Sequence, residues 1–508
     1  MGKNLYITTA IPYVNGAPHI GNAMDYLLAD ICARYYRQSG REVRFEVGVD
    51  EYGNKIARKA QEAGLAPQAY ADKMYPNFEA LMKKIGTTYT DFIRTTSPEH
   101  TATVQYIWQK LQPYIYKGTY EGWYCIGCER FITEKEVAET NGVCPDHQTP
   151  YEKLSEENYY FKLSAFGEQI KTAIESHKLL IVPEFRQKEI LDLITTGLHD
   201  ISVSRPKKHL SWGVPVPGDE SQVIYVWIDA LSNYLTVLGY PKNEQWKEFW
   251  PADVQVVGKD ILRFHAAIWQ AMLIGLDLPT SKKILVHGHV IANGAKISKS
   301  TGNSIDPNEI IDSYGLDAFR YFFSRHIPTL DDGDFTWEKF ENAYNNELGN
   351  ELGNLIQRVA AMINRYQSGV IGDLIKGEHD TQAYRDYMDS LQFNRAFDEV
   401  WNMIRSLNVY IEDVKPWQVA KKAETEPEEK GHLEEILTYL SGSLLQISDL
   451  LSPFLPGTAK TINEIFSTGV VRLPESGVLF PKLHLHTPEP AKAPADPNKP
   501  QPLPLVVR

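Results

Sequence analysis

The sequence predicts an α/β protein built on a parallel sheet, with an insertion between the two halves of the sheet domain and a helical bundle after it. Three observations carry this prediction. Strand-like and helix-like runs alternate near the amino terminus, cysteines cluster between Cys125 and Cys144, and strand-like runs stop near Asn345. Alternating strands and helices are typical of parallel sheets, because each helix carries the chain back to start the next strand.

The bulk composition is that of a globular chain of roughly two to four domains. The 508 residues are 43% hydrophobic and 23% charged, and no apolar run reaches the length of a membrane span. The first residues, MGKNLYITTA, lack the apolar stretch of a secretory signal, so we expect a cytoplasmic protein. The net charge of −13 argues against a general nucleic-acid binder, although a local basic face can still bind RNA.

The amino-terminal unit, residues 1–117, is predicted to form the first half of the sheet domain. The run NLYITTAIPYV is rich in β-branched and aromatic residues and predicts a buried strand. Ala23, Leu27, Ile31 and Tyr35 then recur every four residues until Gly40, which predicts an amphipathic helix ended by glycine. The run REVRFEVGVDEYG predicts the next strand, parallel to the first.

An insertion is predicted over residues 118–222, where the segments become short, turn-rich and cysteine-bearing before helical spacing returns. Buried strands are then predicted at SQVIYVWIDAL, DVQVVGKDI and KKILVHGHVIANG, so residues 223–344 form the second half of the sheet domain. Residues 345–484 have helical apolar spacing and predict a bundle. The proline-rich tail, residues 485–508, is expected to be disordered.

The stretch PHIGN lies at the predicted start of the first helix. Unpaired backbone N–H groups at that position attract anions. Gly21 has no Cβ and lets a nucleotide approach the backbone, while His19 and Asn22 add side-chain donors. The alternative is that His19 and Asn22 only cap the helix, since Asn is a favoured capping residue.

The stretch ANGAKISKSTGN follows the last predicted strand of the sheet domain. Lys296 and Lys299 lie three residues apart, with Ser298 between them and a glycine on either side. This composition is typical of a mobile loop whose ammonium groups close on a polyphosphate. The alternative is a solvated surface loop.

The insertion holds a candidate metal site. Cys125 and Cys128 form a Cys-x2-Cys pair, and Cys144 and His147 form a Cys-x2-His pair after fifteen intervening residues. Two such knuckles fit tetrahedral zinc with three thiolates and one imidazole. A site closed by four protein ligands is structural, and the alternative is four unligated loop residues.

Together, HIGN and KISKS resemble the two ATP motifs of class I aminoacyl-tRNA synthetases. The blocks YITTAIPYVNGAPHIG, GVDEYGNKIARKA, VIYVWIDALSNY, GKDILRFHAAIWQAML and HGHVIANGAKISKSTGN resemble, in this order, the methionyl-tRNA synthetase family. The resemblance runs from about Asn4 to about Leu451. The chain departs from the family at Asn22, where the first motif usually ends in His, while Ile297 in the second motif is a tolerated replacement for Met.

This resemblance implies a Rossmann-like catalytic domain that binds ATP with Mg²⁺. The matching ATP-binding positions are His19, Gly21, Asn22, Lys296, Ser298 and Lys299. Four of these, His19, Asn22, Lys296 and Lys299, match positions that act on the phosphates in catalysis.

The resemblance also implies a methionine pocket. Ile11 and Tyr13 match positions that line it, and Asp50 matches the carboxylate that holds the substrate's ammonium group. The methionine side chain is expected against Trp227, Tyr234 and His265. Aromatic walls with one polar group suit an uncharged thioether, although an aromatic pair such as Trp227 and Tyr234 is more often ordinary core. Leu231 stands where the family often has Pro.

Two helical blocks, NELGNLIQRV and VKPWQVAKK, resemble the family's anticodon-reading segments and imply tRNA(Met) as the partner. Asn354 and Arg358 lie on one helix face, and Trp417 is placed to stack on a splayed base. The alternatives are a helix hydrogen bond for Asn354 and bundle core for Trp417.

The implied activity is that of a monomeric methionine–tRNA ligase, which forms methionyl-adenylate and then charges the 3′-terminal adenosine of tRNA. One alternative is a class I synthetase for another apolar amino acid or for cysteine. Others are a non-catalytic tRNA-binding relative, favoured by Asn22, and a small nucleotidyltransferase, which would not explain the zinc insertion or the helical bundle.

Overall fold

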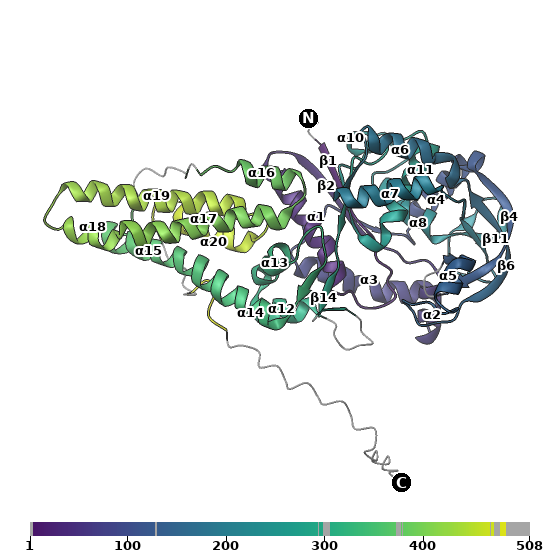
Figure 1. Ribbon diagram of the computed structural model, residues 1–508, viewed down its shortest axis with the longest axis horizontal. Coiled ribbons are helices and arrows are strands. Elements are labelled where there is room, and N and C mark those ends of the chain that lie inside the picture. The colour runs from purple at the N-terminus through teal and green to yellow at the C-terminus, as the bar shows by residue number, and fades with distance from the viewer. Residues whose placement is uncertain are drawn as a thin grey trace, which may run out of the picture.

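The protein is described from a computed structural model that covers residues 4–126, 130–292, 294–297, 305–371, 377, 379–467, 469–471 and 478–483. Figure 1 shows an α/β body that continues into an elongated bundle of helices. In the described residues, no helix is long and apolar enough to cross a membrane. The predicted disordered tail, residues 485–508, lies outside the described residues.

A six-stranded sheet forms the centre of the body, and every neighbouring pair of its strands is parallel. The predicted parallel-sheet class is therefore confirmed. The outermost strand β7 comes from the segment that the sequence assigns to the insertion, so the inserted chain also extends the sheet. In spatial order the strands are β3 (Asp91–Arg94), β2 (Glu42–Val49), β1 (Asn4–Thr9), β12 (Val254–Gly258), β13 (Lys283–His287) and β7 (Leu180–Val182).

Apolar side chains on the two faces of this sheet belong to two separate cores. Leu5 and Ile7 of β1 pack in one cluster, whereas Tyr6 packs in the other. Alternate residues of a strand point to opposite faces, so helices cover both sides. The helices of the body are α1 (Ile20–Gln38), α2 (Asn54–Glu62), α3 (Pro67–Lys84), α4 (Pro98–Lys110), α6 (Gly167–Glu175), α7 (Glu184–Thr196), α8 (Val226–Leu231), α9 (Asn233–Thr236), α10 (Trp246–Phe249), the π-helical segment Phe264–Trp269 and α11 (Gln270–Gly275).

The predicted first helix is present as α1. Ala23, Leu27 and Ile31 of its apolar repeat are buried, as is Cys32, whereas Tyr35 is only partly buried. The helix ends at Gln38, and Gly40 follows with a φ of +79°, a conformation that suits a residue without a Cβ. The sequence therefore predicts where this helix begins and where it ends.

Besides α6, α7 and β7, the segment predicted as an insertion carries most of two antiparallel sheets and a short helix. One sheet has the order β5 (Arg130–Ile132), β4 (Ile115–Cys125), β6 (Glu152–Phe161) and β8 (Ile201–Ser202). The other has the order β10 (Pro215–Val216), β11 (Asp219–Ile224) and β9 (Ser204–Pro206), and α5 spans Glu134–Glu139.

Two strand predictions are wrong in detail. The strand expected over SQVIYVWIDAL ends at Ile224 in the antiparallel sheet, and Val226–Leu231 is helical, because a short buried run has no periodicity that separates strand from helix. The strand expected over KKILVHGHVIANG divides into β13 and β14 (Val290–Ala292). Between them Gly288 passes so close to the main chain of Asp331 that a Cβ would lie 2.1 Å from its carbonyl carbon.

Among the described residues after β13, the elements are helices apart from a small sheet of β15 (Ala295–Lys296), β14 and β16 (Gly333–Phe335). This confirms the predicted helical carboxyl-terminal region. We call the helices from α15 onward the helical extension. The helices are α12 (Pro307–Tyr314), α13 (Leu316–Arg325), α14 (Trp337–Asn342), the π-helical segment Ala343–Gly353, α15 (Asn354–Gln367), α16 (Gln382–Asp389), α17 (Phe393–Val414), α18 (Pro416–Lys422), α19 (Glu428–Leu451) and α20 (Pro456–Phe466).

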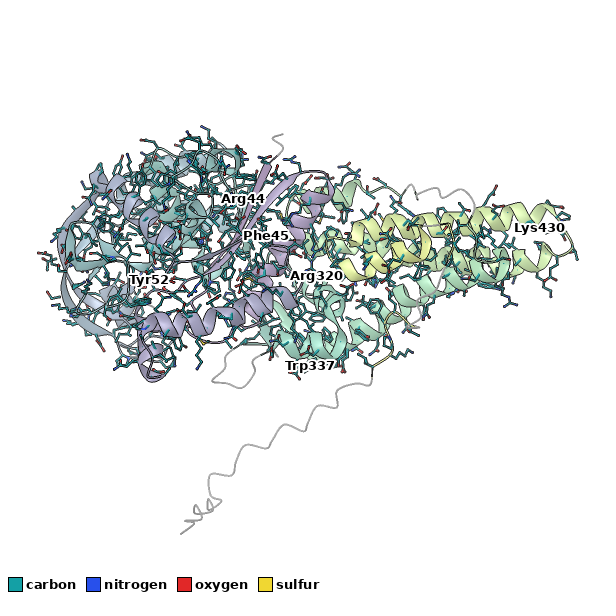
Figure 2. All side chains as sticks on the ribbon, turned by 180° about the vertical axis from the view of Figure 1, so that it is seen from behind. Arg44, Phe45, Tyr52, Arg320, Trp337 and Lys430 are labelled. Atoms are coloured by element: carbon teal, nitrogen blue, oxygen red, sulfur yellow. The ribbon has the colours of Figure 1, made fainter. Side chains whose placement is uncertain are left out.

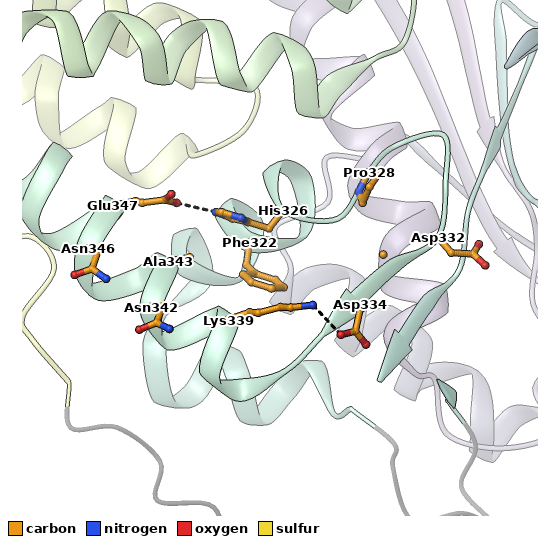
Figure 3. Close-up of a pocket in the computed structure, with 11 residues that line it drawn as sticks. Phe322, His326, Pro328, Asp332, Asp334, Lys339, Asn342, Ala343, Asn346 and Glu347 are labelled. Atoms are coloured by element: carbon orange, nitrogen blue, oxygen red, sulfur yellow. Dashed lines mark hydrogen bonds and ion pairs between the residues drawn. The ribbon is translucent and has the colours of Figure 1, made fainter. Parts of the chain in front are cut away.

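A cavity of about 540 Å³ lies where α13, β16 and α14 meet (Figure 3). Four of the titratable groups that line it form two pairs: His326 lies 2.7 Å from Glu347, and Lys339 lies 2.8 Å from Asp334. The first pair connects the end of α13 to the π-helical segment before α15, and the second connects α14 to β16.

Candidate active site

The amino terminus of α1 brings His19 and Asn22 together. His19 is the N-cap residue, and its Nδ1 accepts a hydrogen bond of 3.0 Å from the N–H of Gly21. In return, the Oδ1 of Asn22 accepts a bond of 3.1 Å from the N–H of His19. This reciprocal pair is a capping box, so both side chains do cap the helix as the alternative interpretation held. Capping also holds an exposed imidazole at the positive end of the helix, where an anion would bind.

The geometry of the cap explains why position 21 is a glycine. A Cβ at position 21 would lie 2.9 Å from Cε1 of His19. Any larger residue would therefore push the imidazole away from the cap, which agrees with the expectation that this position stays open.

Asp25 of α1 and His287 form a pair near the amino terminus of α1 that the sequence analysis did not identify. The Nε2 of His287, at the end of β13, lies 2.6 Å from Oδ1 of Asp25 in α1, and its Nδ1 lies 2.7 Å from the carbonyl of Gly288. Burial alone would lower the pKa of His287, but the Asp25 carboxylate outweighs burial and raises it. The pair joins the helix of the first motif to the strand that leads into the second.

The structure describes only part of the second motif. The backbone of Lys296 lies in β15 and pairs with Ile291 of β14. Ser298 and Lys299 lie outside the described residues. The motif therefore begins in a small sheet beyond the carboxyl end of β13, rather than directly at the edge of the large sheet.

Tyr13 and Asp50 meet where β1 and β2 end. They form an isolated parallel bridge, in which the N–H of Asp50 donates to the carbonyl of Pro12 at 2.9 Å and that of Val14 donates to the carbonyl of Asp50 at 3.1 Å. The Asp50 side chain is 4% exposed, and its Oδ1 accepts a long bond of 3.3 Å from the N–H of Tyr52. A carboxylate held this way by backbone pairing is a fixed anchor for a cation.

Tyr234 and His265 form a buried hydrogen-bonded pair. The Tyr234 hydroxyl lies 2.8 Å from Nε2 of His265, while the Nδ1 of His265 lies 3.0 Å from the carbonyl of Ile261. Burial lowers the pKa of His265 to about 4, so the imidazole is neutral at pH 7. The carbonyl holds the proton on Nδ1, which leaves Nε2 to accept from the hydroxyl. The pair is polar but uncharged.

Trp227 lies parallel to Phe264, with ring centroids 3.4 Å apart and an interplanar angle of 9°. Phe264 was not singled out from the sequence, although it directly precedes His265. Trp227 remains partly exposed, whereas Tyr234 is 1% exposed. The core interpretation therefore fits Tyr234 and does not fit Trp227.

The strands that lead to Tyr13 and to His265 are neighbours, because β1 precedes Tyr13 and β12 precedes the helical segment that carries His265. β1 pairs in parallel with β12, and the N–H of Ala10 donates to the carbonyl of Val256 at 3.1 Å. Ile11 follows directly and lies against Gly48 of β2. The carboxyl ends of adjacent parallel strands share one edge of the sheet, which is where such sheets bind ligands.

The insertion brings the cysteine and histidine candidates together. Ligand atoms of Cys125, Cys144 and His147 lie within 4.8 Å of one another, and Sγ of Cys144 is 3.5 Å from Nδ1 of His147. Cys125 and Cys144 are buried and share a small core with Ile132 and Tyr151. Two thiols and an imidazole converging in this way fit a zinc ion. The fourth predicted ligand, Cys128, lies outside the described residues.

A cavity of about 840 Å³ opens between α2 and the sheet of the insertion. Asn15, two residues beyond Tyr13, lines one side of it, and Nζ of Lys55 lies 5.4 Å from the centroid of the Tyr13 ring. In a chain of net charge −13 this lining is notably cationic. It includes Lys55, Arg58, Lys59 and Arg205, with His147, His209 and Glu152.

The candidate RNA-binding residues lie on the helical extension. Asn354 is exposed at the start of α15, and Arg358 one turn later forms an ion pair of 2.6 Å with Glu412. Trp417 is in the first turn of α18 and is 39% exposed, so it is not bundle core.

Comparisons with known proteins agree on one family. A family model described as "tRNA synthetases class I (M)" matches residues 5–153 and 141–360. A methionine–tRNA ligase from Caldanaerobacter subterraneus subsp. tengcongensis is 44% identical over 479 residues, which are 91% of this chain and 74% of that protein. One from Streptomyces coelicolor is 40% identical over 482 residues, 91% of this chain and 89% of that protein.

A solved structure is similar throughout. The crystal structure of Mycobacterium tuberculosis methionyl-tRNA synthetase bound by methionyl-adenylate matches with a TM-score of 0.87 and 32% identity. The match covers 94% of this chain and all of that one. The similarity therefore includes the body and the helical extension together.

Proposed function

This chain belongs to the class I methionyl-tRNA synthetases, and from that premise we propose that it is a methionine–tRNA ligase. It activates methionine with ATP to methionyl-adenylate and transfers the methionyl group to the 3′-terminal adenosine of tRNA(Met). The observation that supports this proposal is that the capped α1 terminus, Asp50 and His265 each follow the carboxyl end of one of three neighbouring parallel strands, β1, β2 and β12.

In the first step an oxygen of the methionine carboxylate attacks the α-phosphorus of ATP, and the bond to the leaving pyrophosphate breaks. The chain supplies positioning and charge stabilisation, because no covalent bond to the protein is needed. We assign His19, Gly21 and Asn22 to the phosphates together with Lys296, Ser298 and Lys299. ATP arrives with Mg²⁺, which screens the phosphate charge.

The amino acid is held from two sides in this proposal. Asp50 binds the ammonium group of methionine, and Ile11, Tyr13 and Trp227 surround the side chain. The Tyr234–His265 pair gives the pocket wall a polar but uncharged part, whose two protons are already donated to Nε2 of His265 and to the carbonyl of Ile261. A neutral histidine suits such a wall, since a buried cation facing an apolar side chain would be costly.

In the second step the ribose hydroxyl of the terminal adenosine attacks the methionyl carbonyl, and AMP leaves. We propose that the 3′ end of tRNA reaches the adenylate through the cationic cavity beside Tyr13. Its lysine and arginine side chains provide a local positive field for RNA phosphates. Asn354, Arg358 and Trp417 then contact the anticodon at the far end of a monomeric enzyme.

We further propose that Cys125, Cys128, Cys144 and His147 hold one structural Zn²⁺ in the insertion. The convergence of three of these groups supports the assignment. Metal analysis should find one zinc per chain, and the Cys144→Ser variant should lose it.

The decisive experiment is methionine-dependent exchange of labelled pyrophosphate into ATP, run in parallel with several other amino acids. We expect exchange with methionine and none above background with leucine, valine or cysteine. Exchange with another amino acid but not with methionine would overturn the proposed function.

A further inference from the structure

Helix α13 lies between the ATP helix α1 and the helical extension, and one of its turns carries an arginine and an aspartate that bond to both sides. Arg320 is fully buried. Figure 2 labels it where the extension meets the body. Asp317, three residues earlier on the same face, is half-buried.

Arg320 joins α13 to three separate segments. On the body side, Nη1 lies 2.8 Å from Oδ2 of Asp30 in α1 and donates to the carbonyl of Ile85 at 3.1 Å, after α3. On the extension side, Nε donates to the carbonyl of Phe454 at 2.7 Å and Nη2 to that of Pro453 at 2.8 Å. A planar guanidinium suits this task because its donors point in fixed, divergent directions.

Asp30 completes the contact on the body side. Its Oδ1 accepts from the N–H and the hydroxyl of Thr88, at 2.7 and 2.6 Å, and its Oδ2 pairs with Arg34 at 2.7 Å. Burial alone would raise the pKa of Asp30, but Arg320 and Arg34 outweigh burial and lower it. A buried ion pair is stable only when its remaining polar atoms are bonded, as they are here.

Asp317 completes the contact on the extension side. Its carboxylate accepts from the N–H and the hydroxyl of Thr458, the latter at 2.6 Å, and from the N–H of Gly457 at 3.4 Å. These residues form the first turn of α20, where an anion is favoured. Arg320 thus donates to carbonyls of the turn between α19 and α20, and Asp317 accepts from the amides at the start of α20. We call Asp317 and Arg320 the α13 clamp.

The helix that the clamp holds also carries the ATP motif. α1 has 19 residues and is therefore about 28 Å long. His19 caps its amino end, whereas Asp30 and Gln38 face the clamp and the extension. Nε2 of Gln38 donates to the carbonyl of Asp449 in α19 at 2.8 Å. The single helix α1 therefore links His19, which is proposed to bind ATP, to the base of the helical extension.

We propose that Asp317 and Arg320 are positioning residues for tRNA charging. They fix the helical extension relative to α1, so that a tRNA held by the extension presents its 3′ adenosine to the adenylate. This inference rests on the proposed function, which assigns the anticodon to the extension. The contact of Asp317 lies on the extension side of α13, so we expect methionine activation not to depend on it.

The test is the variant Asp317→Ala, which removes the contact with α20 and leaves the Arg320–Asp30 pair in place. We expect kcat/KM for tRNA charging to fall at least about tenfold, while kcat and KM of methionine-dependent exchange stay within about twofold of wild type. Asp317→Asn keeps one acceptor oxygen and should recover part of the charging. The matched control is Asp312→Ala, because Asp312 pairs with Lys84 on the surface of the body, 2.7 Å away.

A double-mutant cycle separates positioning from simple stability. Asp317→Ala and Trp417→Ala should reduce charging less than additively, since both act on the tRNA held by the extension. An equal loss of exchange and charging would make Asp317 merely structural, and unchanged charging would show that the clamp does not position tRNA. Either result overturns the inference. Absence of methionine-dependent exchange in the wild type would instead overturn the proposed function.

Discussion

At the scale of single residues, capping and nucleotide binding turn out to be compatible roles for His19 and Asn22. The imidazole accepts from the backbone of the first turn, and the amide returns a bond to the backbone of His19. The sequence alone left these roles as alternatives. In the structure, the cap is what holds both side chains at the end of the helix where phosphates are expected.

The substitutions His19→Ala and Asn22→His separate these two roles. We expect His19→Ala to lower the maximal rate of exchange at least about tenfold, which corresponds to roughly 1.4 kcal/mol of transition-state stabilisation. Asn22→His should leave exchange equal or higher, because a neutral imidazole can accept the same bond from the N–H of His19 and a protonated one would instead place positive charge beside the phosphates. Both rates are measured at saturating methionine and ATP.

Asn22→Asp is the matched control for the cap. It keeps the acceptor oxygen but places a negative charge beside the phosphates, so exchange should fall although the helix stays capped. Loss of activity in Asn22→His would show that the corner has been rebuilt around the amide.

Motif residues were predictable from the sequence, whereas their partners were not. His19, Asp50 and Cys144 stand in recognisable patterns, so their types and spacing predicted chemistry. Asp25 and His287 are 262 positions apart, and only the fold brings them to 2.6 Å. Phe264 and the clamp residues were missed for the same reason, since no local pattern marks a long-range contact.

At the scale of elements, strand β2 contains a carboxyl group that the fold does not satisfy. Glu46 is fully buried, and among the described residues neither of its side-chain oxygens has a hydrogen-bond partner. Burial, with a smaller contribution from Asp91, raises its pKa well above the usual value of 4.5. The group is therefore neutral in the folded protein over a pH range in which the unfolded chain is ionised.

This arrangement makes the stability of the sheet fall as pH rises. Above about pH 4.5 the unfolded chain releases the Glu46 proton while the folded chain keeps it, so ionisation favours unfolding until the folded pKa is reached. We expect Glu46→Leu to stabilise the body by about 1–3 kcal/mol, the usual cost of an unsatisfied buried polar group. The gain should be larger at pH 8 than at pH 5, measured as the midpoint of thermal unfolding.

Glu46→Gln distinguishes charge from shape, because it keeps the size of the side chain and removes the titration. Its midpoint should match wild type at pH 5 and exceed it at pH 8. Equal midpoints at both pH values would mean that the carboxyl is stabilised in its charged form by a neighbour.

Elements with a clear period were predicted well, and short buried runs were not. The four-residue repeat of α1 specified that helix completely, whereas Val226–Leu231 is an apolar run that forms a helix after being predicted as a strand. The position of β7 at the sheet edge was equally inaccessible, since strand order depends on long-range pairing. Periodicity reports which face of an element is buried, and not which element covers it.

At the scale of the whole molecule, body and extension share one apolar core. The cluster that includes Leu27 of α1 and Val256 of β12 continues through Phe319 of α13 to Trp401 and Leu444 in the helical extension. The extension is therefore packed onto the body rather than tethered to it. A rigid junction of this kind lets binding at one end set the position of a long substrate at the other.

The last prediction concerns Trp417 and tests tRNA binding by the helical extension separately from methionine activation in the body. The Trp417 ring is 39% exposed at the first turn of α18, so a base can stack on it without any rearrangement of the core. Stacking of this kind is worth about 1–3 kcal/mol per base. We therefore expect Trp417→Ala to raise the KM for tRNA about tenfold or more, while methionine-dependent exchange, which involves no RNA, keeps its wild-type rate.

Val409→Ala is the control, since Val409 is 59% exposed on neighbouring α17 and no RNA contact is assigned to it. An unchanged KM for tRNA would place the anticodon elsewhere on the extension, and a parallel loss of exchange would mean that Trp417 supports the fold instead of the RNA.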